Sequence, residues 1–417
     1  MKKKVFISGG AGVIGKCLVN LLAKNNYEIF VGDLKDKPQN FNNEIFYRKG
    51  DLNFLSEDEI KSFQPDIFVH LAAVFERTDE SYDFYDNNFR NNITLSYHLL
   101  KTISKLKTVK KIIYASSYLT YDEKIYMGKD NEKNFKIGEN EKLNPRNLIG
   151  ASKLYHEKEL KLFKNYNKSK EIDILRIFRG YGCGSNDIVS RWVRAALLNK
   201  PLKVYGEKGK FDYIFSEDSA NAIFSLIKKK TKNNSNNIFN LGSGQNYQIN
   251  DLLQILKNKF KKIKIIKTNK KILLENSFSN NQKIFKFTDW KPKFTLKKGV
   301  DKIIKYEKQR FKIIIKKNNS NILISSFSEK KFPIFSYIND FNLKNNYFQK
   351  VFISNMKKNI FHNYFGNKFL KLPECKTENY NKIFVILKKN NIKFVLPTSD
   401  FEINFWSLVK KRLLNRD

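Results

Sequence analysis

The chain has 417 residues, of which 41% are hydrophobic and 14% aromatic, enough for two domains that each bury a core. No apolar run is long enough to predict insertion into a membrane. The cysteines Cys17, Cys183 and Cys375 lie too far apart to predict a disulfide framework or a metal site, and they indicate a reducing cytoplasm. The net charge of +38 comes mainly from lysines that are scattered over nearly every predicted element. Such a distribution is typical of a solvated surface, and an abundance of lysine codons is typical of an AT-rich genome. It does not indicate a specific nucleic-acid site.

A buried strand, a glycine-rich turn and an amphipathic helix open the chain. The strand is predicted over residues 4–8 and the helix over 16–24. In this order, the first glycine permits a tight turn, the second lets the backbone approach a pyrophosphate, and the third lets the helix pack against the strand. The start of the helix then presents N–H groups to the phosphates. The candidate cofactor-binding residues of this segment are Gly9, Gly12, Val13, Ile14 and Gly15.

A second strand, predicted over residues 27–33, ends at Asp33. A carboxylate at this place accepts hydrogen bonds from the adenosine ribose and repels a 2′-phosphate, which favours NAD over NADP. The alternative is a strand-terminal aspartate that only starts a turn.

Further strands are predicted over residues 67–73 and 111–117, with helices between them. This alternation predicts an α/β fold with a doubly wound parallel sheet. Such a sheet binds its ligands at the carboxyl ends of the strands, where Asp33, Ala72, Ser117 and Lys153 fall.

The segment 147–153, Asn-Leu-Ile-Gly-Ala-Ser-Lys, resembles the Y-G-x-S-K active-site segment of the extended short-chain dehydrogenase/reductase family, the nucleotide-sugar epimerases and dehydratases. The match continues in order from the glycine turn to Asn240–Gly244, which resembles the closing N-x-G-S-G turn of the family. The resemblance implies a Rossmann sheet with a small substrate-binding subdomain, NAD as cofactor and a nucleotide sugar as substrate. Homodimerisation through a helix pair is usual in the family.

The resemblance also implies cofactor contacts beyond the glycine turn. His70 begins the H-L-A-A ending of a strand, and we assign it no chemistry. The implied contacts are Asp51, Leu52, Leu71, Ala72, Ala73, Asn92 and Lys153.

The catalytic segment departs from the family at Ile149. In the family a tyrosine passes a proton to or from the sugar hydroxyl while the nicotinamide takes or gives a hydride. A lysine four residues later lowers the pKa of that phenol and holds the nicotinamide ribose, and a serine binds the same substrate oxygen. Ser117 and Lys153 match these positions, but Ile149 replaces the tyrosine. Because acid–base catalysis contributes about 10²–10⁴-fold, we expect reduced or altered activity.

Other tyrosines are poor substitutes for the missing phenol. Tyr166 also precedes a lysine by four residues, but it lies far along the predicted helix, away from the strand ends. Tyr118 and Tyr121 lie nearer, and we expect them to pack or to form local hydrogen bonds.

The substrate half shows a second departure. Arg179 stands where the family usually has asparagine, and Phe211 replaces an arginine that commonly pairs with the substrate diphosphate. A phenyl ring does not replace a bidentate guanidinium. Lys208, Lys210 or Arg179 is expected to compensate in part by its charge. The candidate substrate-binding residues are Ser117, Arg179 and Phe211.

The last hundred residues predict a separate α/β domain. We place a linker at 311–319 and a second Rossmann-like domain at 320–417. The run Leu396-Pro397-Thr398-Ser399-Asp400-Phe401-Glu402 resembles the I-P-T-x-D-x-E signature of the subdomain that precedes the ATP-binding domains in ATP-grasp ligases of the carbamoyl-phosphate-synthase type. Because those ATP-binding domains are missing, we expect a truncated or split protein with no ligase activity.

Two interpretations of function remain. In the first, residues 1–310, with a substrate subdomain largely from 180–310, form an NAD-dependent nucleotide-sugar epimerase/dehydratase of reduced or altered activity. In the second, the chain is a non-catalytic scaffold that binds NAD or a nucleotide sugar.

Overall fold

The computed structural model divides the chain into two compact units, Met1–Glu307 and Lys308–Asp417, and each is described by itself. The residues that the structure describes are 2–75, 81–128, 135–205, 208–229, 236–267, 274–314, 320–345, 348–358, 362 and 368–414.

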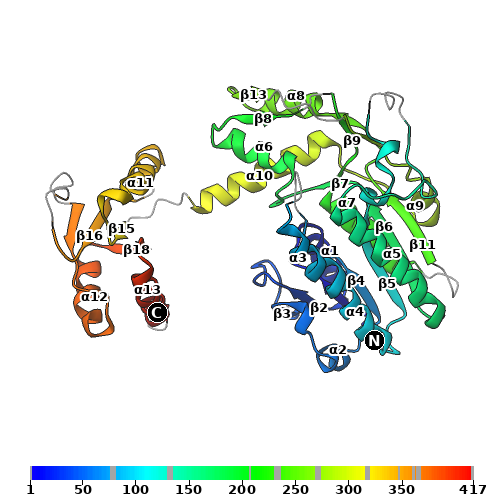
Figure 1. The fold of residues 1–417 in the computed structure, drawn as a ribbon, viewed down its shortest axis with the longest axis horizontal. Helices are drawn as coiled ribbons and strands as arrows, with labels where there is room; N and C mark the ends of the chain where they lie inside the picture. The colour runs from blue at the N-terminus through cyan, green and yellow to red at the C-terminus, as the bar shows by residue number, and fades with distance from the viewer. Residues whose placement is uncertain are drawn as a thin grey trace. The chain divides into compact units, whose positions relative to one another are not determined.

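The first unit is built on a seven-stranded sheet in which every neighbouring pair is parallel (Figure 1). Its order, β11-β6-β5-β4-β1-β2-β3, reverses at β1, so β1 and β4 border the switch point where such sheets bind ligands. The predicted doubly wound sheet is confirmed. Its strands are β1 (Lys4–Ser8), β2 (Glu28–Asp33), β3 (Phe46–Lys49), β4 (Ile67–His70), β5 (Lys111–Ser117), β6 (Glu171–Ile177) and β11 (Asn236–Leu241).

Two apolar cores, one on each face of the sheet, hold the helices in place. Because side chains alternate along a strand, Val5 and Ile7 of β1 enter one core while Phe6 enters the other. The first core includes side chains of α1 (Val13–Lys24), α7 (Ser216–Lys228) and α9 (Gln282–Phe287). The second includes side chains of α2 (Glu57–Phe63), α4 (Leu95–Ser104) and α5 (Leu148–Tyr166). The short helix α3 (Phe84–Asn88) precedes a π-helical segment, Phe89–Thr94, which leads into α4.

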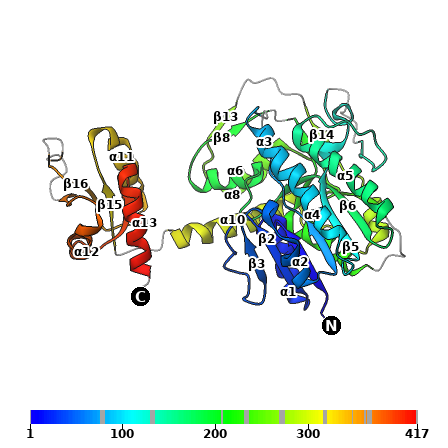
Figure 2. The same cartoon turned by 60° about the horizontal axis from the view of Figure 1, so that its bottom comes forward.

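After β6 the chain forms several smaller sheets (Figure 2), which pack around a third apolar core. Within residues 180–310, however, α7, β11 and α9 belong to the main sheet and its first core. The remaining strands are β7 (Arg179–Tyr181), β8 (Leu202–Val204), β9 (Lys210–Phe211), β10 (Tyr213–Phe215), β12 (Tyr247–Gln248), β13 (Ile265–Lys267) and β14 (Asn276–Ser277). The remaining helices are α6 (Ile188–Leu197), α8 (Ile249–Lys259) and α10 (Leu296–Ile314).

The second unit contains a four-stranded parallel sheet in the order β17-β16-β15-β18. Leu323 and Ile324, adjacent in β15, belong to cores on opposite faces. The strands are β15 (Asn321–Ser325), β16 (Val351–Asn355), β17 (Phe369–Lys371) and β18 (Ile392–Pro397). The helices are α11 (Phe332–Asn345), α12 (Tyr380–Lys389) and α13 (Asp400–Leu414).

Helix α10 extends beyond Glu307, the last residue of the first unit, to Ile314, so residues 311–314 of the predicted linker are helical. No glycine or proline interrupts this stretch of Lys, Phe and Ile, and nothing in it ends the helix early. Residues 315–319 of that linker lie outside the described residues. In the part of the chain that is described, no helix is both long and apolar enough to cross a membrane.

The close packing of α1 against the first turn predicts the effect of one substitution. A Cβ at Gly15 would lie 2.4 Å from the Gly9 carbonyl oxygen and 2.7 Å from the Gly10 Cα. Both atoms are backbone, so Gly15→Ala should lower the free energy of unfolding by about 1–3 kcal/mol. Chemical denaturation measures this. Gly138→Ala is the control, because its Cβ would come no nearer than 3.8 Å to a neighbour, and an equal loss in both variants would contradict the packing argument.

Candidate functional site

The turn after β1 is shaped by its glycines. Gly9 has φ +77°, and a Cβ there would lie 2.6 Å from the backbone nitrogen of Ala72, which follows β4. Gly12 is the N-cap of α1 and provides no side-chain cap, so the first N–H groups of the helix, those of Val13 and Ile14 among them, lack a partner within the helix. The turn therefore offers backbone donors and the positive end of the helix dipole to an anion.

Asp33, at the end of β2, is fixed beside this turn. Its Oδ2 accepts a hydrogen bond from the Ala11 N–H at 2.9 Å, and its Oδ1 accepts one from the Lys35 N–H at 3.0 Å. Each carboxylate oxygen can accept a further bond. The predicted acidic group and the predicted glycines thus lie together.

Asp51 and Leu52, after β3, make two different contacts. Asp51 pairs with Arg90 at 2.5 Å and accepts the N–H of Asn53. Leu52 is buried and packs on Gly32 of β2, where a Cβ would lie 2.5 Å from Leu52 Cδ2.

Asn92 fixes the loop that follows β4. Its amide exchanges two hydrogen bonds of 2.9 Å with the backbone of Val74, just beyond Leu71, Ala72 and Ala73. It also donates to Asn88 Oδ1 at 2.7 Å, and Asn88 in turn donates to Ser152 Oγ at 2.8 Å. Asn92 lies in the π-helical segment, a distortion that is frequent at functional sites. The sequence did not single out Asn88 or Ser152, which connect this loop to α5.

Lys153, one turn beyond Ile149 in α5, is buried beneath the carboxyl end of β5. Its Nζ donates to the Ala115 carbonyl at 2.8 Å and lies 4.8 Å from the centre of the Tyr114 ring. Burial lowers the pKa of Lys153 to about 8, against the opposing attraction of Glu157. Ile149 is 7% exposed. The hydroxyl of Ser117, at the end of β5, accepts the Leu119 N–H at 3.2 Å.

The tyrosines near the site are already engaged. Tyr118 is buried and donates to Glu275 Oε1 at 2.7 Å, while Tyr121 is buried and donates to Asn240 Oδ1 at 2.6 Å. Burial raises the pKa of both phenols, that of Tyr121 to about 12. Tyr166 is the last residue of α5 and is 89% exposed. Tyr118 and Tyr121 are therefore poorly suited to proton transfer at neutral pH.

A buried ion pair fixes α5 to β6. Arg176 donates to both oxygens of Glu157, at 3.0 and 2.7 Å, and Ser116 of β5 donates to the same carboxylate at 2.5 Å. Both charged residues are at most 4% exposed. Glu157 follows Lys153 by four residues, so the two lie on one face of the helix. The sequence analysis did not assign this pair a role.

Arg179 lies over Phe211 on the substrate side. The guanidinium carbon is 4.6 Å from the centre of the phenyl ring, so of the three candidate compensating cations Arg179 is the one placed against it. Arg179 also pairs with Glu275 at 2.5 Å, and Arg146, just before α5, pairs with the same carboxylate at 3.2 Å. Burial alone would raise the pKa of Glu275, but the two arginines hold it below its usual range. The sequence analysis missed both Arg146 and Glu275.

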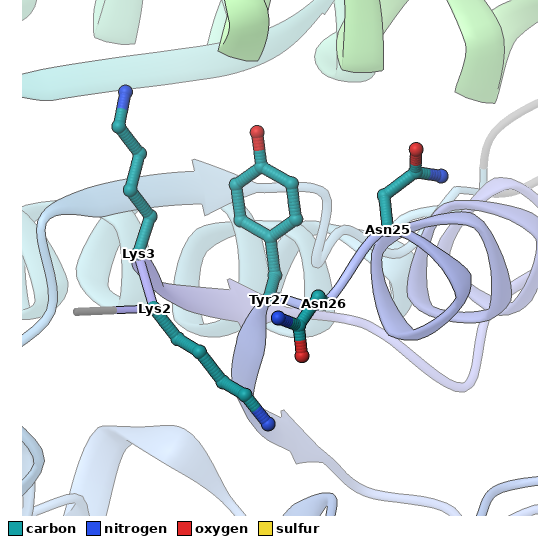
Figure 3. Close-up of a pocket in the computed structure, with 5 residues that line it drawn as sticks. All are labelled: Lys2, Lys3, Asn25, Asn26 and Tyr27. Atoms are coloured by element: carbon teal, nitrogen blue, oxygen red, sulfur yellow. The ribbon is translucent and has the colours of Figure 1, made fainter.

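The surface pocket of about 580 Å³ formed by Lys2, Lys3, Asn25, Asn26 and Tyr27 lies elsewhere. These residues are at the amino ends of β1 and β2, the opposite edge of the sheet from the site. Figure 3 shows the side chains of Lys2 and Lys3 leaving the strand on opposite sides, so they do not converge on a ligand. Within the described ranges, no three His, Cys, Asp or Glu side chains gather closely enough to hold a metal ion.

Known proteins resemble the chain over this region. The model of the NAD dependent epimerase/dehydratase family matches residues 5–242. A putative UDP-glucose 4-epimerase of Methanocaldococcus jannaschii is 26% identical over 73% of this chain and 98% of its own length. A dTDP-D-glucose 4,6-dehydratase of Dictyostelium discoideum is 30% identical over 60% of each chain. The structure of UDP-glucuronic acid 4-epimerase from Bacillus cereus, in complex with UDP-glucuronic acid and NAD, has a TM-score of 0.65 and 23% identity, covering 74% of this chain and 99% of its own.

The buried pair between α5 and β6 yields a test of what supports the site. Glu157→Gln leaves Arg176 buried with an uncompensated charge and should lower the free energy of unfolding by about 3–5 kcal/mol. Glu59→Gln breaks an exposed ion pair with Arg48 and should cost at most about 1 kcal/mol. Urea unfolding compares the two variants, and a loss at Glu157 no larger than that at Glu59 would be evidence against the anchoring role.

Proposed function

The chain belongs to the NAD-dependent epimerase/dehydratase family, and from this membership we propose that its first unit binds NAD and a nucleotide sugar, with reduced or altered turnover. The observation that carries the proposal is the meeting of the glycine turn, Asp33 and Lys153 at the carboxyl edge of one parallel sheet. The relatives include an epimerase and a dehydratase, which supports a nucleotide sugar as substrate without choosing between these reactions.

The residues at this edge fit a dinucleotide. The space at Gly9 and Gly15 is so narrow that any side chain would collide with backbone, and the start of α1 is free to hold a pyrophosphate. Asp33 retains acceptor capacity for the ribose hydroxyls. Bound NAD supplies the acceptance and return of a hydride.

The protein's own groups would then orient the substrate more than transfer its protons. Lys153 carries its charge beside the carboxyl end of β5, and Ser117 offers a hydroxyl there. Ile149 has no group that gives or takes a proton, and Tyr118 and Tyr121 donate to other side chains. Binding with little turnover follows from this set of residues.

The same observations support a second candidate function, a non-catalytic module that binds NAD or a nucleotide sugar and serves a partner. In that case the protein no longer turns over its ligand, and neither Ile149 nor the hydrogen-bonded phenols of Tyr118 and Tyr121 need to transfer a proton.

The pKa of Lys153 makes cofactor binding depend on pH. Because the ammonium loses its proton above about pH 8, the affinity for NAD should fall as the pH rises through that value. Fluorescence titrations at a series of pH values measure this. Lys153→Met should bind NAD more weakly and with no such step.

Lys170→Met is the matched control for this titration. Lys170 is also buried, but its Nζ donates to the carbonyls of Leu106 and Val109, beyond the amino end of β6. The Lys170→Met variant should therefore still show the fall in NAD affinity near pH 8. A wild-type affinity that does not change with pH would argue against contact between Lys153 and the cofactor, and failure to bind NAD at any pH would refute the proposed function.

Restoring the phenol separates the two candidate functions. If the site still accepts substrate, Ile149→Tyr should turn over a UDP-, GDP- or dTDP-sugar at least about 10²-fold faster than the wild type. Ile149→Phe adds the ring without the hydroxyl and should give no gain. A wild-type rate equal to that of the tyrosine variant would show that Ile149 is no defect, and an inactive tyrosine variant that still binds NAD would favour the non-catalytic module.

A further inference from the structure

One buried carboxylate, that of Glu275, serves two arginines on the substrate side. Its Oε2 accepts from Arg179 Nη2 at 2.5 Å and from Arg146 Nη2 at 3.2 Å, and its Oε1 accepts from Arg179 Nε at 3.3 Å. The hydroxyls of Tyr118 and Ser277 donate to Oε1 at 2.7 and 2.8 Å. The carboxylate is thus fully engaged, and the three charged groups together carry one net positive charge.

The cluster lies at the edge of the sheet where the candidate site lies. Tyr118 directly follows Ser117 at the end of β5, Arg146 directly precedes Asn147, the N-cap of α5, and Arg179 opens β7 just beyond β6. The side chains of Arg179 and Arg146 are 37% and 22% exposed, whereas that of Glu275 is 6% exposed. The side chains of the two arginines are therefore partly exposed, whereas the carboxylate between them is covered.

The guanidinium of Arg179 lies close to two aromatic rings. It is 4.6 Å from the centre of the Phe211 ring and 5.9 Å from that of Tyr118. Cation–π contacts of this kind stabilise the charge in place, and its planar fork suits bidentate recognition of phosphate. Two of the donor nitrogens of the fork, Nε and Nη2, are already bonded to Glu275.

We infer that Glu275 sets the anion affinity of the substrate site, because it competes as an internal carboxylate with the ligand's phosphates for Arg179 and Arg146. The inference rests on the proposed function, in that the ligand is a nucleotide diphosphate carrying a sugar. Glu275 reduces the positive charge of the cluster from two to one and occupies donors that a diphosphate would use. Substrate binding then has to share or displace an internal contact, which makes Glu275 a specificity-determining residue.

Glu275→Gln tests this competition directly. With the carboxylate neutralised, UDP should bind about tenfold more tightly, as expected when one charge-assisted hydrogen bond becomes available. Arg179→Gln should weaken UDP binding by a similar factor. Calorimetric titration of the full chain with UDP at low salt measures both effects. Glu57→Gln, which removes the same charge from an exposed pair with Lys105, controls for the net charge of the protein and should leave UDP binding unchanged.

The outcomes separate this inference from the function on which it rests. If UDP binds the wild type and Glu275→Gln binds it equally or more weakly, Glu275 supports the arginines instead of competing, and the inference is overturned. If neither protein binds UDP although both bind NAD, the proposed nucleotide-sugar site falls and the inference with it.

A double variant covers the risk that Glu275→Gln does not fold. Arg146→Met combined with Glu275→Gln removes one charge of each sign and still releases Arg179. It should bind UDP more tightly than Arg146→Met alone, and equal affinities would again overturn the inference.

Discussion

The buried pair of Glu157 and Arg176 is the constraint on which the geometry of the site depends. It joins α5 to β6, and Ser116 brings β5 into the same contact. A pair of charges taken out of water stabilises a fold only weakly overall, but losing one partner is costly, so such a pair fixes an arrangement more than it adds stability. Lys153 lies one helical turn before Glu157, and its ammonium is consequently held against β5. The position of α5, the candidate catalytic helix, is therefore fixed by its contacts with β5 and β6 and not by residues on the substrate side.

The cofactor side and the substrate side of the site differ in the kind of chemical group that lines them. On the proposed cofactor side, the surface consists mainly of backbone N–H groups and of Gly9 and Gly15, where no side chain fits. On the substrate side, the charged groups come from segments far apart in the sequence, with Glu275 contacting Arg146 and Arg179. Ile149 and Phe211, two departures from the family pattern, both lie on the substrate side.

The sequence predicted what depends on local pattern and missed what depends on long-range contacts. Buried strands such as Lys4–Ser8 and Lys111–Ser117 were predicted residue for residue, because a continuous apolar run ending in small polar residues is a strong local signal. A helix that reaches into the predicted linker, at residues 311–314, was not predicted, because the end of a helix without glycine or proline has no clear marker. The engagement of Tyr118 by Glu275 could not be read from the chain, since 157 positions separate them. The resemblance of the second unit to the ATP-grasp class stays a prediction.

Replacement of a catalytic phenol by isoleucine need not disturb the rest of such a site. An isoleucine side chain has no donor or acceptor, so the polar contacts that hold α5 involve other groups: the Asn147 cap on Gly150, the Lys153 bond to Ala115 and the Glu157 pair. An apolar side chain at a buried position also avoids the cost of an unpaired hydroxyl, so the substitution is tolerable for folding even where it is harmful for proton transfer. Binding and chemistry are therefore separable at the proposed site, because the groups proposed to hold the two ligands do not include the residue at position 149.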